Sequence, residues 1–163
     1  MKYQIAEGLK KTAVICLLKC GDQLLLLKRK NEPNKGLYTP VGGKLDPFEA
    51  PEAAAVREIK EETGISVDEV SYCGILVETS PTKYNWTSFV YLSEIEYCEP
   101  PACNEGDLKW IAQDNLDAIK TPETDFYIYH AIFNNTNFNL FANYNQDLNI
   151  ISLYDALENK VLK

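Results

Sequence analysis

The sequence predicts an α+β fold or an α/β/α sandwich, in which a few helices pack against a mixed β-sheet. Strand-like apolar runs outnumber helical segments, and helices do not alternate strictly with strands. A chain of 163 residues with 45% hydrophobic residues is long enough to bury a sizeable core. Because no repeat, linker or low-complexity segment divides it, we expect one domain over residues 1–163.

The N-terminal part of the chain predicts a β-hairpin. The apolar runs Thr12–Cys20 and Gln23–Lys30 are separated only by Gly21-Asp22, which is the length and composition of a tight hairpin turn. The second run ends in three basic residues. A solvated strand end explains them, but beside a phosphate site Arg29 is the one that we expect to reach the phosphate.

A helix is predicted from Pro51 to Thr63, with Gly64 as its C-cap. An earlier start is suggested by Asp46–Glu49, which resembles a capping box. That start would place Pro51 inside the helix, where its ring clashes with the carbonyl four residues earlier, so we expect Asp46–Glu49 to form a turn. We expect Val56 and Ile59 to anchor the helix, and the small side chains of Ala54 and Ala55 to leave room for a ligand.

The remaining elements are three strands, a helical turn, a helix and a hairpin. The strands are predicted at Val70–Glu78, Ser88–Tyr97 and Leu108–Ile111. After them come the turn at Asn115–Ile119, the helix at Glu123–Phe133 and a C-terminal hairpin of Phe138–Tyr144 and Leu148–Tyr154. The loops Thr79–Trp86 and Glu99–Asp107 are long for hairpin connections, which makes them candidates for function.

Charge and cysteine content restrict the possible partners. The formal net charge of −8 argues against binding to a nucleic-acid backbone, although a metal can mask the charge of a single nucleotide. Five cysteines, an odd number, favour free thiols in a reducing cytoplasm over a disulfide framework. A zinc site is the weaker alternative, because the one histidine, His130, fits a packed helix face. No apolar run approaches the ~20 residues of a membrane span, and the N-terminus lacks a signal core.

The predicted helix carries a cluster of acids. Glu58, Glu61 and Glu62 are spaced i, i+3 and i+4, so they share one helix face although like charges at this spacing repel. A solvated acidic face would explain these glutamates alone, whereas a bound cation also explains their proximity. Oxygen ligands favour Mg²⁺, with Mn²⁺ as the alternative, and Mg²⁺ often holds a phosphate as well. Arg57, four residues before Glu61, is placed to orient a carboxylate.

These residues belong to a longer pattern that resembles the Nudix box. The box is a glycine, five residues, Glu, seven residues, Arg-Glu, an aliphatic, one residue, Glu-Glu, one residue, Gly and an aliphatic. Every fixed position is filled, by Gly43, Glu49, Arg57, Glu58, Ile59, Glu61, Glu62, Gly64 and Ile65. Nine specified positions make an accidental match very improbable. The strands before and after the box are also similar in order to those of the family.

The resemblance implies an α/β/α sandwich around a mixed sheet and hydrolysis of a nucleoside diphosphate linked to another group. Carried over by position, Glu58, Glu61 and Glu62 are metal ligands, and the Gly42 carbonyl completes the shell. Either Glu58 or Glu62 is implied as the base that acts through water. Arg57 orients a carboxylate and Lys44 meets a phosphate. The partner is a small nucleotide, and family members are monomers or homodimers.

Two segments resemble the MutT-type 8-oxo-dGTP and purine triphosphate pyrophosphatases. Glu105 stands where such enzymes carry an extra metal-binding glutamate, and Asp125 where an acid reads the base edge. Thr39 occupies the position of a base-reading asparagine, which is a departure from the pattern. Tyr38 and Trp86 are candidates to stack on a base, or else ordinary core or surface aromatics.

Two other functions stay open. Pro81, sixteen residues after the box, resembles a feature of ADP-ribose pyrophosphatases, although a turn proline explains it equally well. A nucleotide-sugar substrate belongs to the same alternative. A non-enzymatic nucleotide-binding module is disfavoured, because it has no reason to retain mutually repelling acids.

Overall fold

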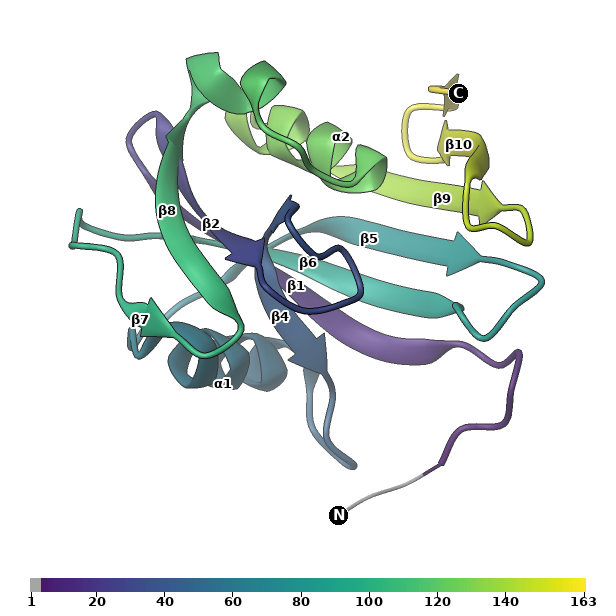
Figure 1. The fold of residues 1–163 in the computed structure, drawn as a ribbon, viewed down its shortest axis with the longest axis horizontal. Coiled ribbons are helices and arrows are strands. Elements are labelled where there is room, and N and C mark those ends of the chain that lie inside the picture. Colours follow the sequence, from purple (N-terminus) through teal and green to yellow (C-terminus); the bar gives the residue numbers. More distant parts are fainter. Residues whose placement is uncertain (1–3) are drawn as a thin grey trace.

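The structure, a computed structural model that describes residues 4–163, has a β-sheet with one long helix on each face (Figure 1). Its first four strands are β1 (Lys11–Cys20), β2 (Gln23–Arg29), β3 (Tyr38–Thr39) and β4 (Val41–Lys44). The central strands are β5 (Ser71–Thr79), β6 (Trp86–Glu94), β7 (Ala102–Cys103) and β8 (Gly106–Ala112). The last are β9 (Phe138–Tyr144), β10 (Ile150–Asp155) and β11 (Lys160–Val161). The helices are α1 (Pro51–Thr63), the 3-10 helix η1 (Gln113–Ala118) and α2 (Glu123–Phe133).

The strands form one mixed sheet. Their order is β11-β10-β9-β5-β6-β1-β2-β8-β7, and in addition β3 pairs with β2 and β4 with β1. The pairs β1·β6 and β5·β9 are parallel, and the other pairs are antiparallel. The mixed sheet is therefore confirmed, together with the hairpin of β1 and β2 and the C-terminal hairpin of β9 and β10.

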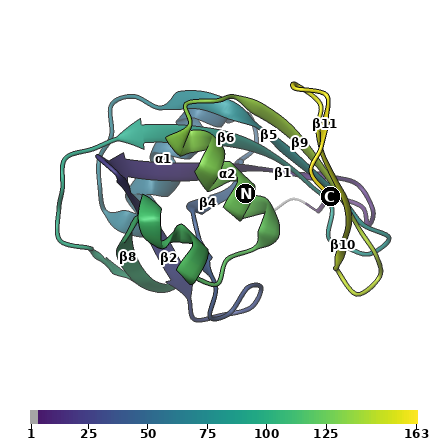
Figure 2. The ribbon, with the colours of Figure 1, turned by 90° about the horizontal axis from the view of Figure 1, so that it is seen from above.

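Alternation along β1 divides the core into two layers. Leu17 faces the side covered by α2, where it packs in one cluster with Ile128 and Tyr129. Its neighbours on β1 face the other side, where they pack with Ala54 and Ile59 of α1. Figure 2 shows α1 and α2 on opposite sides of the sheet. This arrangement confirms the predicted sandwich.

Both long helices have the predicted bounds. Pro51 stands at the start of α1, and Gly64 ends it in the left-handed conformation, with φ of 74°. The preceding segment Asp46–Glu49 is a turn, as expected, in which the Glu49 amide donates to the Asp46 carbonyl. Phe48 in this turn has φ of 66° and a fully exposed side chain.

Some details of the sequence prediction are wrong. Ala54 and Ala55 do not leave room for a ligand, because both are fully buried against the sheet, where their small size lets α1 approach closely. The strand predicted from Ser88 begins at Trp86, since Trp86 pairs with Lys11 of the parallel strand β1. The strand predicted from Leu148 begins at Ile150, because Leu148 has a positive φ.

No helix in residues 4–163 is long and apolar enough to span a membrane.

Candidate active site

The acidic face of α1 lies against the glycines of β4. The Gly42 amide donates to Glu62 Oε2 at 3.2 Å. A Cβ on Gly43 would lie 2.4 Å from Glu58 Oε1, and a Cβ on Gly42 would lie 2.1 Å from the Val14 carbonyl oxygen. Gly42 is therefore required for the close approach of β4 to β1, whereas a side chain on Gly43 would displace the Glu58 carboxylate.

Arg57 holds the acids on either side of it. Its Nε donates to Glu49 Oε2 at 2.7 Å and its second terminal nitrogen, Nη2, donates to Glu49 Oε1 at 2.8 Å, so this pair is bidentate. Nη1 donates to Glu58 Oε1 at 2.8 Å and to Glu61 Oε2 at 3.1 Å. Nη2 also donates to the Lys44 carbonyl. The predicted orienting role of Arg57 thus has a geometric basis, and Glu49 is the partner to which it donates two hydrogen bonds.

The acids differ in their electrostatic environment. Burial raises the pKa of Glu62 to about 8, and the charges of Glu105 and Glu58 add to this shift. Burial also raises the pKa of Glu58, although Arg57 opposes the shift. Hydrogen bonds from Arg57 lower the pKa of Glu49. Negative charge at Glu62 is therefore poorly compensated by the chain itself.

This set of donors fits a divalent cation. Carboxylate oxygens of Glu58, Glu61 and Glu62, with the carbonyl of Gly42 beside them, are the ligands that Mg²⁺ and Mn²⁺ prefer. Within residues 4–163, no group of three or more acidic, cysteine or histidine side chains is arranged to hold a metal ion by itself. That is compatible with Mg²⁺, which is held by one or two carboxylates, substrate phosphates and water. The common face of Glu58, Glu61 and Glu62 on α1, in contact with the backbone of Gly42, is the feature that favours a cation here.

A cavity of about 550 Å³ opens beside this acidic face. Gly42 lines it, so the cavity and the Glu62 carboxylate meet at the same residue. Its apolar lining includes Ile15, Leu76 and Ile150, and its aromatic lining is Tyr84, Trp86 and Tyr144. Mixed apolar and aromatic walls at this volume are typical of small-molecule sites.

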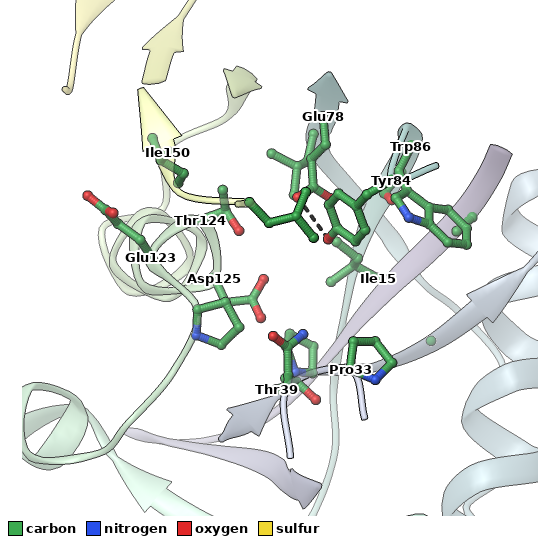
Figure 3. Close-up of a pocket in the computed structure, with 18 of the residues that line it drawn as sticks. Ile15, Pro33, Thr39, Glu78, Tyr84, Trp86, Glu123, Thr124, Asp125 and Ile150 are labelled. Atoms are coloured by element: carbon green, nitrogen blue, oxygen red, sulfur yellow. Dashed lines mark hydrogen bonds between the residues drawn. The ribbon is translucent and has the colours of Figure 1, made fainter. Parts of the chain in front are cut away.

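Two polar groups of the cavity lining have no hydrogen-bond partner within residues 4–163. Asp125, at the start of α2, is 8% exposed, and no hydrogen bond to its carboxyl group is found within residues 4–163. Thr39 Oγ1 is buried and likewise has no hydrogen-bond partner in the described part of the chain. In Figure 3, Asp125 points into the cavity, between Thr39 and Glu78. A ligand with polar edges would satisfy these groups.

The cavity brings together four of the predicted substrate residues, which are Arg29, Thr39, Trp86 and Asp125. Lys44 does not line it, but its Nζ lies 5.9 Å from the centre of the Trp86 ring. Tyr38 is not part of the lining and packs against the core on the α2 side.

Glu105 lies near the acidic face, where its charge acts on Glu62 and Glu58. Its Oε2 is 3.7 Å from an Arg29 terminal nitrogen. This pair connects the predicted extra metal ligand to the predicted phosphate-binding arginine, and through Arg29 to the cavity.

Among the lining residues that sequence reasoning missed are Glu78, Tyr84 and Tyr144. Both tyrosine hydroxyls donate to Glu78 Oε2. The long loop before β6 gave a signal for Tyr84, because such loops carry function. No local pattern marked Glu78 or Tyr144, which are 66 residues apart in sequence.

A pH-dependent stability difference is expected at Asp125. Burial and the charge of Glu78 raise the pKa of Asp125 to about 8. The native state therefore holds this proton at pH values where the unfolded state has lost it, so the contribution of Asp125 to stability falls as pH rises towards 8. The free energy of unfolding of Asp125→Asn relative to wild type should increase by roughly 2–3 kcal/mol between pH 5.5 and 8.5.

Urea unfolding at the two pH values measures this difference. Asp114→Asn, an exposed change on η1, serves as the control and should show no such increase. An equal stability difference at both pH values for Asp125→Asn would mean that Asp125 ionises normally in the native protein.

Comparison with known proteins agrees with the family resemblance found in the sequence. The NUDIX domain family model matches residues 9–132. A Bacillus subtilis (strain 168) protein, provisionally named as an 8-oxo-dGTP diphosphatase, is 30% identical over 140 residues, which are 85% of this chain and 83% of that protein. The ADP-ribose pyrophosphatase of Methanocaldococcus jannaschii is 43% identical over 63 residues, but this match spans 39% of this chain and only 37% of that protein.

A solved structure confirms the fold. The crystal structure of a mutator MutT protein from Bacillus halodurans superimposes with a TM-score of 0.79 at 23% identity. The match covers 90% of this chain and 98% of the other. The likeness therefore covers more of the chain than the 124 residues (9–132) of the family model.

Proposed function

The chain belongs to the Nudix family of hydrolases, which act on pyrophosphate bonds, and we propose that it cleaves a nucleoside triphosphate such as 8-oxo-dGTP. The products are the nucleoside monophosphate and pyrophosphate. Nudix hydrolases generally use divalent metals, and we propose Mg²⁺ here because the donors are all oxygens.

The proposal rests on one observation. The cavity that can hold a base is lined by Gly42, and the amide of Gly42 is hydrogen-bonded to Glu62 of the acidic face. A nucleotide with its base in the cavity would therefore bring its phosphates towards Glu58 and Glu62. Arg29, which lines the cavity and pairs with Glu105, stands on this route.

Individual residues have separate roles in the proposed hydrolysis. Arg29 and Lys44 bind phosphate oxygens, and Arg57 fixes the carboxylates of Glu58 and Glu61. Either Glu58 or Glu62 removes the proton of the attacking water. Each keeps one carboxylate oxygen free of hydrogen bonds within the described residues, Glu58 Oε2 and Glu62 Oε1. When bound, Mg²⁺ neutralises the pyrophosphate and lowers the pKa of a coordinated water.

The base site also follows from the cavity. Trp86, with the Nζ atoms of Lys11 and Lys44 5.3 and 5.9 Å from its ring centre, stands at one side as a surface for stacking. Asp125 binds the polar edge of the base from the other side of the cavity, because its carboxyl group makes no hydrogen bond within residues 4–163. Thr39 adds a second unpaired polar group to this edge.

ADP-ribose is the second candidate substrate. The similarity to an ADP-ribose pyrophosphatase favours it, but that match covers only 63 residues, which are 39% of this chain. The relative with the longer match is the provisional 8-oxo-dGTP diphosphatase. We therefore rank the nucleoside triphosphate first.

A substrate panel tests the proposal. The protein is incubated with Mg²⁺ and 8-oxo-dGTP, the four canonical dNTPs, ADP-ribose or nucleotide sugars, and kcat/KM is measured for each. We expect 8-oxo-dGTP to exceed dGTP at least tenfold, since a site with unpaired polar groups discriminates strongly between base edges. A higher kcat/KM for ADP-ribose than for every triphosphate would overturn the proposal.

A further inference from the structure

Glu78 is a buried acid that the hydrolytic steps do not use. It is 6% exposed and lies near the end of β5, in the wall of the cavity. Lys10 approaches its backbone, since Lys10 Nζ donates to the Glu78 carbonyl at 2.9 Å. A buried carboxylate is costly unless it is paired, so its place in a ligand cavity calls for a physical reason.

Two tyrosines fix the orientation of Glu78. The hydroxyls of Tyr84 and Tyr144 both donate to its Oε2 atom, and the two rings contact each other edge to face at 5.6 Å. No hydrogen bond to Oε1 is found in residues 4–163, so this oxygen remains available to a ligand. Tyr144 lies on β9, outside residues 9–132 that match the family model.

Asp125 and Glu78 present different hydrogen-bonding groups to the same cavity. Burial and the charge of Glu78 raise the pKa of Asp125 to about 8. Burial also raises the pKa of Glu78, although the hydroxyls of Tyr144 and Tyr84 and the charge of Lys10 oppose this shift. Oε2 of Glu78 is an acceptor, because both tyrosine hydroxyls donate to it, whereas the carboxyl group of Asp125 makes no hydrogen bond within the described residues.

We propose that Glu78, positioned by Tyr84 and Tyr144, determines specificity by accepting hydrogen bonds from a base edge with two adjacent donors, as in guanine. The N1–H and N2 amino groups of guanine are such a pair, and oxidation at C8 leaves them in place. Adenine presents an acceptor, N1, beside its amino group, which leaves unlike groups facing the carboxylate. This inference rests on the proposed function in one respect, namely that the cavity holds the base.

Glu78→Gln and Tyr144→Phe test this role. Steady-state kinetics with dGTP and dATP give the ratio of the two kcat/KM values, and equilibrium binding of dGMP and dAMP gives the same comparison without cleavage. Glu78→Gln should lower the guanine-over-adenine ratio roughly tenfold or more, because it replaces one of the two carboxyl oxygens by an NH2 donor. Tyr144→Phe should lower it by a smaller factor, mainly through KM, because Tyr84 still holds Glu78.

The control is Glu94→Gln, which changes an exposed glutamate at the end of β6 outside the cavity lining. It should leave the ratio unchanged. An unchanged ratio in folded Glu78→Gln would overturn the inference, even if the enzyme cleaves triphosphates as proposed. If Glu78→Gln does not fold, the double variant Tyr84→Phe/Tyr144→Phe decides, and an unchanged ratio there overturns the inference as well.

The two readouts separate this inference from the proposed function. Cleavage of ADP-ribose alone would contradict the proposed substrate. A preference for dGMP over dAMP that disappears in Glu78→Gln would still support the role of Glu78, since binding of the monophosphates does not depend on hydrolysis.

Discussion

Glu62→Gln should lower kcat for the best substrate by roughly 10²–10⁴-fold, with little effect on folding. The change removes a negative charge from the acidic face, yet glutamine retains an oxygen that can accept the Gly42 amide. Because burial and Glu105 disfavour the charge of Glu62, we expect the metal-free variant to be no less stable than wild type. Turnover at saturating Mg²⁺ and urea unfolding in a chelator measure the two effects.

Glu52→Gln is the matched control for this experiment. Glu52 is an exposed residue in the first turn of the same helix and does not line the cavity. Its substitution should leave kcat within about twofold of wild type, as for surface changes remote from a site. If Glu62→Gln turned over the substrate as fast as Glu52→Gln, the assignment of Glu62 as a metal ligand or base would be wrong.

Arg57→Ala should weaken both the fold and the metal site. Loss of the guanidinium leaves the largely buried carboxylates of Glu49 and Glu58 without their charged partner. We expect the free energy of unfolding to fall by about 1–3 kcal/mol. The Mg²⁺ concentration for half-maximal activity should rise roughly 10–100-fold, as when other residues that orient metal ligands are lost. Urea unfolding and a Mg²⁺ titration of activity provide the measurements.

Arg57→Lys separates charge from geometry. Lysine keeps the positive charge but cannot donate to Glu49 through two parallel hydrogen bonds while also holding Glu58. Its stability and Mg²⁺ requirement should lie between those of wild type and Arg57→Ala. Should Arg57→Ala match wild type in both measurements, the hydrogen-bond network around Arg57 would have no part in the site.

The catalytic helix was predictable because its signals are local. Pro51 and Gly64 define its bounds, and the spacing of Glu58, Glu61 and Glu62 fixes their common face. The family pattern connected the same residues to a reaction. The burial of Ala54, in contrast, depends on where the helix packs against the sheet, and the sequence interpretation of that residue was wrong.

The cavity was predictable only in part because distant segments form it. The parallel pairing of β5 with β9 brings Tyr144 beside Glu78. Neither strand has a sequence pattern that predicts this pairing. Tyr38 was a reasonable stacking candidate by composition, yet it packs against the core beside α2. The short strands β3, β4, β7 and β11 were missed for the same reason, since each exists only through its partner strand.

The products formed from 8-oxo-dGTP show whether the protein cleaves a nucleoside triphosphate to the monophosphate and pyrophosphate. Purified protein is incubated with 8-oxo-dGTP and Mg²⁺, with a chelator in the parallel sample, and the phosphorus-containing products are identified by ³¹P NMR. We expect 8-oxo-dGMP and pyrophosphate in equal amounts, and no reaction in the sample with the chelator. Release of 8-oxo-dGDP and inorganic phosphate, or equal turnover in the chelator, would contradict it.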